Sequence, residues 1–180
     1  MEAIVNSPLP TEVSINEIME VYYKDVYLLA YSFVKDQQIA EDIAQDVFIK
    51  CYKYLNSYRG EAPIKSWICT ITVNTAKDYL RKKKVNVFTY SKQILEELLS
   101  TESAEVVFEK NNEKDVLLQK VLALPFKYRE VIILHYFYDL KISEVGTMLE
   151  LKENTVKTRL SRGRDLLKKQ LKREGGYFGR

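Results

Sequence analysis

Apolar residues recur every three or four positions along most of this 180-residue chain, a spacing that predicts α-helices. In the first half, stripes of this kind cover residues 15–33 and 40–55, with a polar break between them. The segment 56–63 contains a glycine and a proline and is predicted to be a loop. A third helix is predicted to begin with Ser66 as its N-cap and to end in the basic run 81–84.

The second half repeats the helical spacing after an acidic stretch that has only a weak pattern. Pro125 stops one predicted helix, and the segment 128–138 is apolar nearly all round, as expected of a helix at the centre of a small bundle. A short helix over 142–150 and a long helix follow, separated by a break at 151–152. This pair predicts a helix-turn-helix, and the buried stripe of its long helix comprises Val156, Leu160, Gly163, Leu167 and Leu171.

This order of elements predicts an all-α protein of two small helical domains joined by a flexible linker. With only 6 glycines and 4 prolines, the chain has few of the turn signals that a sheet would need. The expected boundaries are a loose tail over 1–13, a first domain over 14–84, a linker over 85–112, a second domain over 113–174 and a tail over 175–180.

The distribution of charge is more informative than the formal net charge of +3. Between residues 152 and 173, nine basic side chains stand against two acidic ones, whereas the linker is acidic. A solvated helix face usually mixes both signs, because pairs of glutamate and lysine stabilise it. Basic charge concentrated on one helix is instead typical of a surface that binds phosphates.

In a helix-turn-helix the second helix lies in the major groove of DNA, and its N-terminal residues reach the base edges. Arginine suits guanine and asparagine suits adenine, while further basic side chains neutralise phosphates. By position, the candidates for base contacts are Asn154, Thr155, Thr158, Arg159 and Arg162, and Lys157 and Arg164 extend the basic surface.

The sequence gives little support for catalysis, metal or cofactor binding, or membrane insertion. The chain has a single histidine, no glycine-rich phosphate loop and no metal-ligand spacing, so we expect no catalytic residue, metal or cofactor. Cys51 and Cys69 are isolated among apolar residues, which predicts buried thiols in a reducing compartment. The chain shows no apolar run of membrane-spanning length, so we expect a cytoplasmic protein without membrane insertion.

Six short strings occur in a characteristic order. The first domain contains AEDIAQDVFIK (40–50), YRG (58–60), SWI (66–68) and VNTAKDYLR (73–81), and the second contains LPFKYREV (124–131) and NTVKTRLSRGR (154–164). Over residues 14–174 the chain thereby resembles the extracytoplasmic-function type of bacterial RNA polymerase sigma factors. The order and spacing of the strings are more specific than any one of them.

The resemblance implies a protein without catalytic activity that binds core RNA polymerase, at its clamp and flap regions, and directs it to promoter DNA. The first domain would be sigma region 2, which melts the −10 element, and the second would be sigma region 4, which reads the −35 element as duplex. An anti-sigma factor is also implied as a partner. The clamp-facing residues would be Asp42, Gln45 and Asp46, and the −10 DNA would meet Tyr58, Arg59, Trp67, Asn74, Lys77, Arg81 and Lys82.

Alternatives stay open for single residues and for the whole chain. Trp67 could anchor the core, Asn74 could bridge helices, and the acidic positions could form an ordinary solvated face. The chain also departs from the family at Lys152, which cannot cap a helix through its side chain, at Asn154 and at Gly163. The competing hypothesis for function is a stand-alone helix-turn-helix regulator that binds operator DNA without polymerase.

Overall fold

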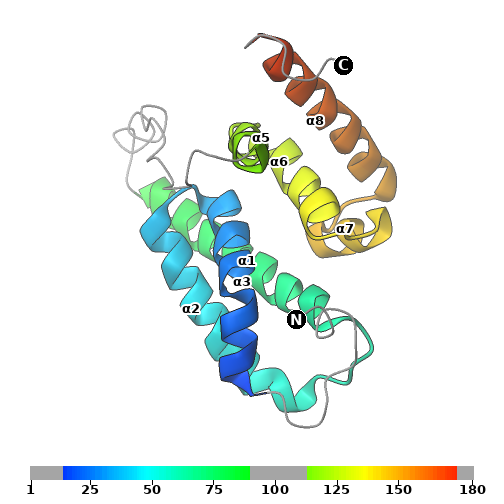
Figure 1. Ribbon diagram of the computed structural model, residues 1–180. Coiled ribbons are helices and arrows are strands. Elements are labelled where there is room, and N and C mark those ends of the chain that lie inside the picture. Colours follow the sequence, from blue (N-terminus) through cyan, green and yellow to red (C-terminus); the bar gives the residue numbers. More distant parts are fainter. Residues whose placement is uncertain (1–13, 90–112, 174–180) are drawn as a thin grey trace. The chain divides into compact units, whose positions relative to one another are not determined.

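The computed structural model describes residues 14–89 and 113–173 (Figure 1). Both predicted tails, 1–13 and 175–180, lie outside the described residues, and so does the predicted linker from residue 90 onward. The described part of the chain contains helices and no strand, which confirms the predicted all-α class. Its helices fall into two compact units, α1 to α3 and α5 to α8.

The first unit is a bundle of three helices, α1 (Ile15–Val34), α2 (Gln37–Tyr54) and α3 (Ile64–Thr89), with a 3₁₀ turn at Leu55–Ser57. Each helix packs against the other two. The predicted stripe of α1 is buried from Ile18 to Phe33, and α2 buries Ala40, Ile43, Val47 and Cys51 against it. The apolar period of the sequence therefore locates the core of this unit.

The starts of α1 and α2 are fixed by side-chain caps. Ser14 accepts a hydrogen bond from the backbone N–H of Glu17, whose carboxylate accepts one from the N–H of Ser14. Asp36 accepts from the N–H of Ile39 in the same way at the start of α2. Lys35 between them adopts the left-handed conformation with φ 54°, so the chain reverses between the two helices in two residues.

The predicted N-cap of the third helix is wrong. The carbonyl of Pro63 accepts hydrogen bonds from the N–H groups of Ser66 and Trp67, so the helix begins at Ile64 and Ser66 lies inside its first turn. A proline suits this place because a helix start needs no N–H donor from it. At its other end α3 continues to Thr89, past the predicted end at residue 84 and into the predicted linker.

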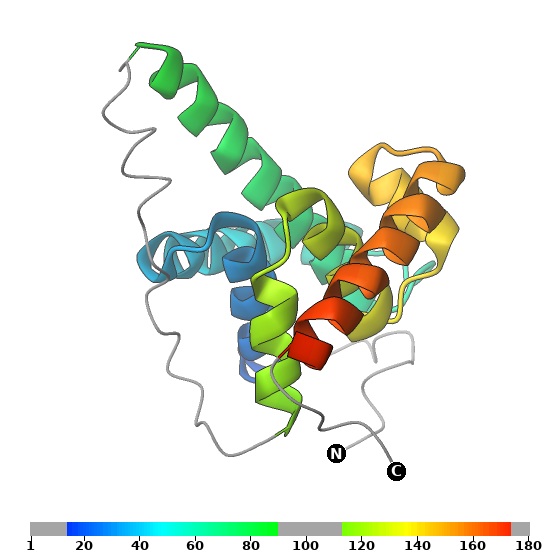
Figure 2. The ribbon, with the colours of Figure 1, turned by 90° about the horizontal axis from the view of Figure 1, so that it is seen from above.

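The second unit comprises α5 (Glu113–Leu122), α6 (Phe126–Ile132), a π-helical turn η2 (Ile133–Phe137), α7 (Ile142–Leu149) and α8 (Glu153–Arg173). The expected single helix over 128–138 is thus α6 followed by a wider turn, whose Ile133 and Leu134 are buried while Tyr136 and Phe137 are exposed. The long helix α8 packs against both α6 and α7 (Figures 1 and 2).

Two glycines allow α8 to lie close to its neighbours. A Cβ atom on Gly146 of α7 would lie 2.8 Å from the carbonyl oxygen of Leu151, in the turn that leads to α8. A Cβ atom on Gly163 of α8 would lie 3.0 Å from Cγ1 of Ile132 in α6. The departure at Gly163 therefore coincides with close helix packing, which offsets the low helix propensity of glycine.

Candidate nucleic-acid interface

The side chain of Lys152 cannot cap the start of α8, because a lysine ammonium group has no hydrogen-bond acceptor. Instead, the carbonyl of Lys152 accepts hydrogen bonds from the N–H groups of Thr155 and Val156, so Lys152 stands at the N-cap position. Asn154 is exposed in the first turn, and its carbonyl accepts a hydrogen bond from the hydroxyl of Thr158 at 2.8 Å. Lys152, Glu153 and Asn154 are all exposed, so one side of the start of α8 is open to solvent.

The sequence-predicted residues of α8 divide into two groups by burial. Thr155 and Arg159 are half-buried on the side of α6. The rest are exposed, namely Asn154, Lys157, Thr158, Arg162 and Arg164, and the exposed Ser161 lies among them. Arg164 also comes within 3.4 Å of the hydroxyl of Tyr136, a long contact.

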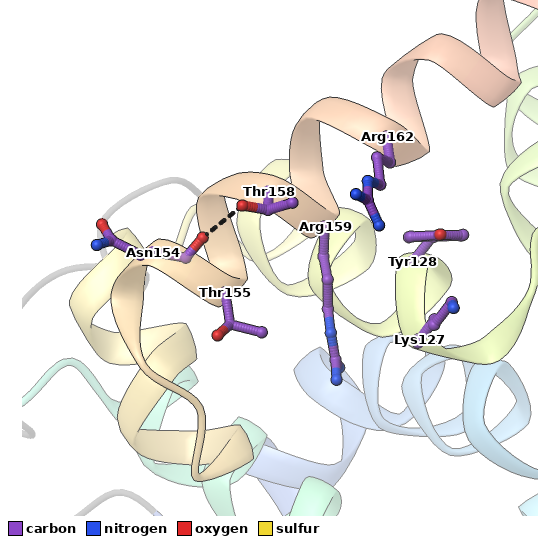
Figure 3. Close-up of a pocket in the computed structure, with 7 residues that line it drawn as sticks. All are labelled: Lys127, Tyr128, Asn154, Thr155, Thr158, Arg159 and Arg162. Atoms are coloured by element: carbon purple, nitrogen blue, oxygen red, sulfur yellow. Dashed lines mark hydrogen bonds between the residues drawn. The ribbon is translucent and has the colours of Figure 1, made fainter.

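An open hollow of about 420 Å³ lies between α6 and α8 (Figure 3). Lys127 and Tyr128 line it from α6, facing Arg159 and Arg162, which extend toward them from α8. The remaining lining residues are Asn154, Thr155 and Thr158. Three cationic side chains thus surround one hollow, which favours an anionic ligand such as a phosphate group.

Within this site Arg159 forms an ion pair that the sequence did not predict. Its Nη1 atom donates to Oε1 of Glu130 in α6 at 2.6 Å, and Glu130 is only 8% exposed. The preceding residue, Arg129, is buried and donates to the carbonyls of Leu122 and Leu124, which closes the turn between α5 and α6. Arg129 therefore connects α6 to the end of α5, and Glu130 connects α6 to α8.

Sequence reasoning missed Lys127, Tyr128 and Glu130 as parts of this site. All three belong to the string LPFKYREV, but helix periodicity places Glu130 in an apolar stretch and says nothing of its partner 29 residues away. A charged residue inside an apolar helix is the one signal that could have indicated a buried pair.

In the first unit, the predicted polymerase-facing residues lie together on α2. Asp42, Gln45 and Asp46 are all exposed, and their spacing of three and four residues puts them on one side of the helix. Ile49 continues this side one turn further and is 64% exposed. An acidic surface that ends in a large exposed apolar side chain differs from a uniformly solvated face, and it suits binding to a protein.

The predicted loop holds an aromatic pair. The Tyr58 ring lies 5.2 Å from the Trp67 ring of α3, measured between centroids, and the Tyr58 hydroxyl donates to the carbonyl of Ala62. Gly60 has a φ of 72°, which lets the loop turn back between these contacts. Burial raises the pKa of Tyr58, so its hydroxyl stays protonated and able to donate.

The other predicted −10 residues follow along α3. Trp67, Asn74 and Arg81 stand seven residues apart, so they share one side of the helix. Asn74, Arg81 and Lys82 are exposed and Lys77 is half-buried, while Arg59 is exposed in the loop. Arg81 donates to the carboxylate of Asp78 at 3.0 Å. Polar and cationic groups therefore extend from the aromatic pair along one helix.

No other candidate site emerges from the described residues. Cys51 and Cys69 are buried free thiols, as predicted, and burial raises the pKa of each to about 12. In residues 14–89 and 113–173, no cluster of three or more potential metal-binding side chains occurs. None of the helices described is both long enough and apolar enough to cross a membrane.

Comparison with known proteins agrees with this geometry. The family model for sigma-70 region 2 matches residues 18–85, and that for sigma-70 region 4 matches residues 114–167. The chain is 35% identical to the ECF RNA polymerase sigma factor SigW of Bacillus subtilis, over 87% of this chain and 88% of SigW. It is 37% identical to the sigma factor SigV of the same organism, over 84% of this chain and 87% of SigV.

Solved structures share the fold. The sigma factor RpoE of Bartonella quintana, solved in complex with the anti-sigma factor NepR, matches with a TM-score of 0.68 at 19% identity, over 87% of this chain and 96% of RpoE. CnrH, solved with the cytosolic domain of CnrY, matches with a TM-score of 0.56, over 89% of each chain. The two family matches together cover most of the chain, which belongs to the sigma-70 family of RNA polymerase sigma factors, among its extracytoplasmic-function members.

Proposed function

We propose that this sigma factor divides promoter recognition between its two units, the first acting on melted −10 DNA and the second on duplex −35 DNA. The observation that carries this division is the contrast between the two surfaces. The second unit presents a long basic helix, whereas the first presents an aromatic pair in a loop beside exposed polar groups. A helix fills a major groove, while stacking platforms take unpaired bases.

At the −35 element, α8 enters the major groove with its N-terminal half. Asn154, Thr155, Thr158 and Arg162 lie in or beside the first three turns and reach base edges, while Lys157 and Arg164 bind phosphates. Arg159 differs from these residues because Glu130 engages its guanidinium group. The α6 side of the hollow, which carries Lys127, then faces the DNA backbone.

At the −10 element, an unpaired base stacks in the loop that holds Tyr58. Flipping a base out of the duplex costs a few kcal/mol, which stacking and edge hydrogen bonds offset. Asn74 has donors and an acceptor for such an edge, and Arg59, Lys77, Arg81 and Lys82 attract the strand. Trp67 supports the Tyr58 ring from α3.

Core RNA polymerase is the partner that holds both units on one promoter. Its clamp binds the side of α2 that carries Asp42, Gln45 and Asp46, and its flap binds the second unit. An anti-sigma factor is a second partner by analogy with RpoE and CnrH, which were solved as complexes with NepR and CnrY. Such a partner would block the polymerase-binding surfaces until it is released.

The test compares the purified full chain with and without core RNA polymerase from its own organism. We expect the chain to co-elute with core in gel filtration and to bind promoter fragments tightly only as holoenzyme. Permanganate should then oxidise unpaired thymines around the −10 element. Tight, sequence-specific binding of operator DNA by the free chain, without co-elution, would instead establish the stand-alone regulator.

A further inference from the structure

Glu130 of α6 contacts α8 through an ion pair, whereas the residues around it contact α8 by apolar packing. Val156 and Leu160 of α8 are buried, and Gly163 packs on Ile132. Apolar packing of this kind has no preferred direction, so it fixes the rotation of a helix about its own axis less sharply than a directional bond does. The 2.6 Å contact between Arg159 and Glu130 is directional, because a charge-assisted hydrogen bond weakens steeply with distance and angle.

The position of Arg159 makes this contact sensitive to rotation. Arg159 comes three residues after Val156 and four before Gly163, so it lies beside the buried stripe and next to the exposed face. Its neighbours on that face are Thr158 and Arg162. Because side chains reach about 5 Å from a helix axis, a rotation of about 20° would move their ends by roughly 2 Å. That displacement is enough to break a hydrogen bond to a base edge.

Because Glu130 is buried, its contact with Arg159 is a stable part of the folded unit and not a transient surface ion pair. The residue is 8% exposed and the side chain of Arg159 is 25% exposed, so solvent competes little for either group. A carboxylate beside a surface that binds phosphates also repels DNA, which lowers affinity for every sequence alike. A group that weakens general affinity can still contribute to specificity if it positions the residues that read bases.

We propose that Glu130 is a positioning residue for promoter recognition, which holds Arg159, fixes the rotation of α8 and so sets which base edges Thr158 and Arg162 reach. The proposal rests on the proposed reading of the −35 element by α8. It assigns Glu130 to specificity, although this residue lies in α6 and is buried.

The test measures base discrimination rather than activity alone. Wild-type holoenzyme is first used to transcribe a promoter library with a randomised −35 region and a constant −10 region, and its preferred sequence is determined from the transcripts. The same library is then transcribed by Glu130→Gln and Arg159→Lys holoenzymes. Glu130→Gln keeps the shape of the side chain and removes its charge. Arg159→Lys keeps the positive charge and removes the planar guanidinium group with its several N–H donors.

We expect each variant to lose discrimination between the preferred and disfavoured −35 sequences by about tenfold, the effect of one misplaced bidentate base contact. The double variant should lose no more than either single variant, because both act through one contact. Binding of Glu130→Gln to random-sequence DNA should stay equal or become tighter. Asp165→Asn, an exposed residue of α8, is the matched control that removes the same charge and should keep the wild-type preference.

Unchanged base preference in folded Glu130→Gln and Arg159→Lys holoenzymes would overturn the proposal. An equal loss on all −35 sequences would also overturn it, because that result marks a role in stability or phosphate binding. Circular dichroism and thermal melting of each variant establish folding independently. If wild-type holoenzyme transcribes this library without preferring any −35 sequence, then the proposed reading by α8 is wrong, and this inference is wrong with it.

Discussion

The ring of Tyr58 lies 5.2 Å from the ring of Trp67, tilted by 48°, and joins the loop to α3. Trp67 is the only tryptophan of the chain, so its fluorescence reports on this pair. We expect a single-stranded −10 oligonucleotide to change that fluorescence in the holoenzyme, once the signal of polymerase tryptophans is subtracted by using a Trp67→Phe variant.

Replacement of Tyr58 tests its stacking role. Tyr58→Ala should weaken binding of a forked −10 template by about tenfold, since stacking of one base on an aromatic side chain contributes about 1–3 kcal/mol. Tyr58→Phe keeps the ring and removes only the hydrogen bond to Ala62, so it should retain most of the binding. Equal binding by the alanine variant would exclude Tyr58 from the base site.

Asn74 should act at strand opening and not at duplex binding. Asn74→Ala should leave the affinity of holoenzyme for duplex promoter nearly unchanged, because α8 supplies duplex contacts. The fraction of open complex should fall several-fold, because an edge hydrogen bond to a flipped base contributes about 1 kcal/mol. Permanganate reactivity equal to that of the wild type would show that the exposed amide of Asn74 has no such role.

Charge reversal on α2 tests the polymerase-binding surface. Asp46→Arg should reduce affinity for core RNA polymerase by tenfold or more, because like charges facing each other across an interface cost several kcal/mol. The fold should be preserved, since Asp46 is exposed. Glu20→Arg, at an exposed position of α1, makes the same change of charge and should bind core as the wild type does. Equal affinities for all three proteins would remove this side of α2 from the interface.

The two glycines of the second unit should respond differently to alanine. At Gly146 the new Cβ atom would meet a backbone carbonyl at 2.8 Å, which cannot move without opening the turn before α8. We expect Gly146→Ala to destabilise the unit by about 1–3 kcal/mol. Gly163→Ala should be milder, because the Ile132 side chain can adjust and alanine favours the helix by up to about 1 kcal/mol. Chemical denaturation monitored by circular dichroism measures the free energy of unfolding of both variants, which should be lower for Gly146→Ala.

The buried thiols should be unreactive in the folded protein. Cys51 is 0% exposed and Cys69 is 2% exposed, and burial raises both pKa values to about 12. Both thiols should resist alkylation at pH 8 and react once denaturant unfolds the chain. Because the pKa of each thiol is raised on folding, its contribution to stability is complete below pH 9.0 and is lost as the pH rises toward 12. Rapid alkylation without denaturant would contradict this burial.

The fold was largely predictable because burial follows helical periodicity. The stripe from Ile18 to Phe33 is buried as its spacing predicts. Of the predicted stripe in α8, Val156, Leu160 and Gly163 are buried, whereas Leu167 and Leu171 are only half-buried. The errors occurred where backbone hydrogen bonds decide the outcome. The carbonyl of Pro63 starts α3 before Ser66 does, and a π-helical turn over Ile133–Phe137 follows α6 where the spacing predicted one continuous helix.

The candidate site was predictable where one helix carries it. The exposed residues of α8 and of α2 follow from spacing within single elements. The contact between Arg159 and Glu130 joins residues 29 positions apart, and that of Tyr58 with Trp67 depends on how a loop closes. Such contacts depend on tertiary packing, which spacing along one helix does not encode.

Promoter selection by this chain is tested most directly by sequencing the 5′ ends of transcripts made from genomic DNA by core polymerase with the chain. We expect start sites that are absent with core alone and that share two upstream motifs, one near −10 and one near −35, at a fixed spacing. Start sites identical to those of core alone, or start sites without a common upstream motif, would contradict this expectation.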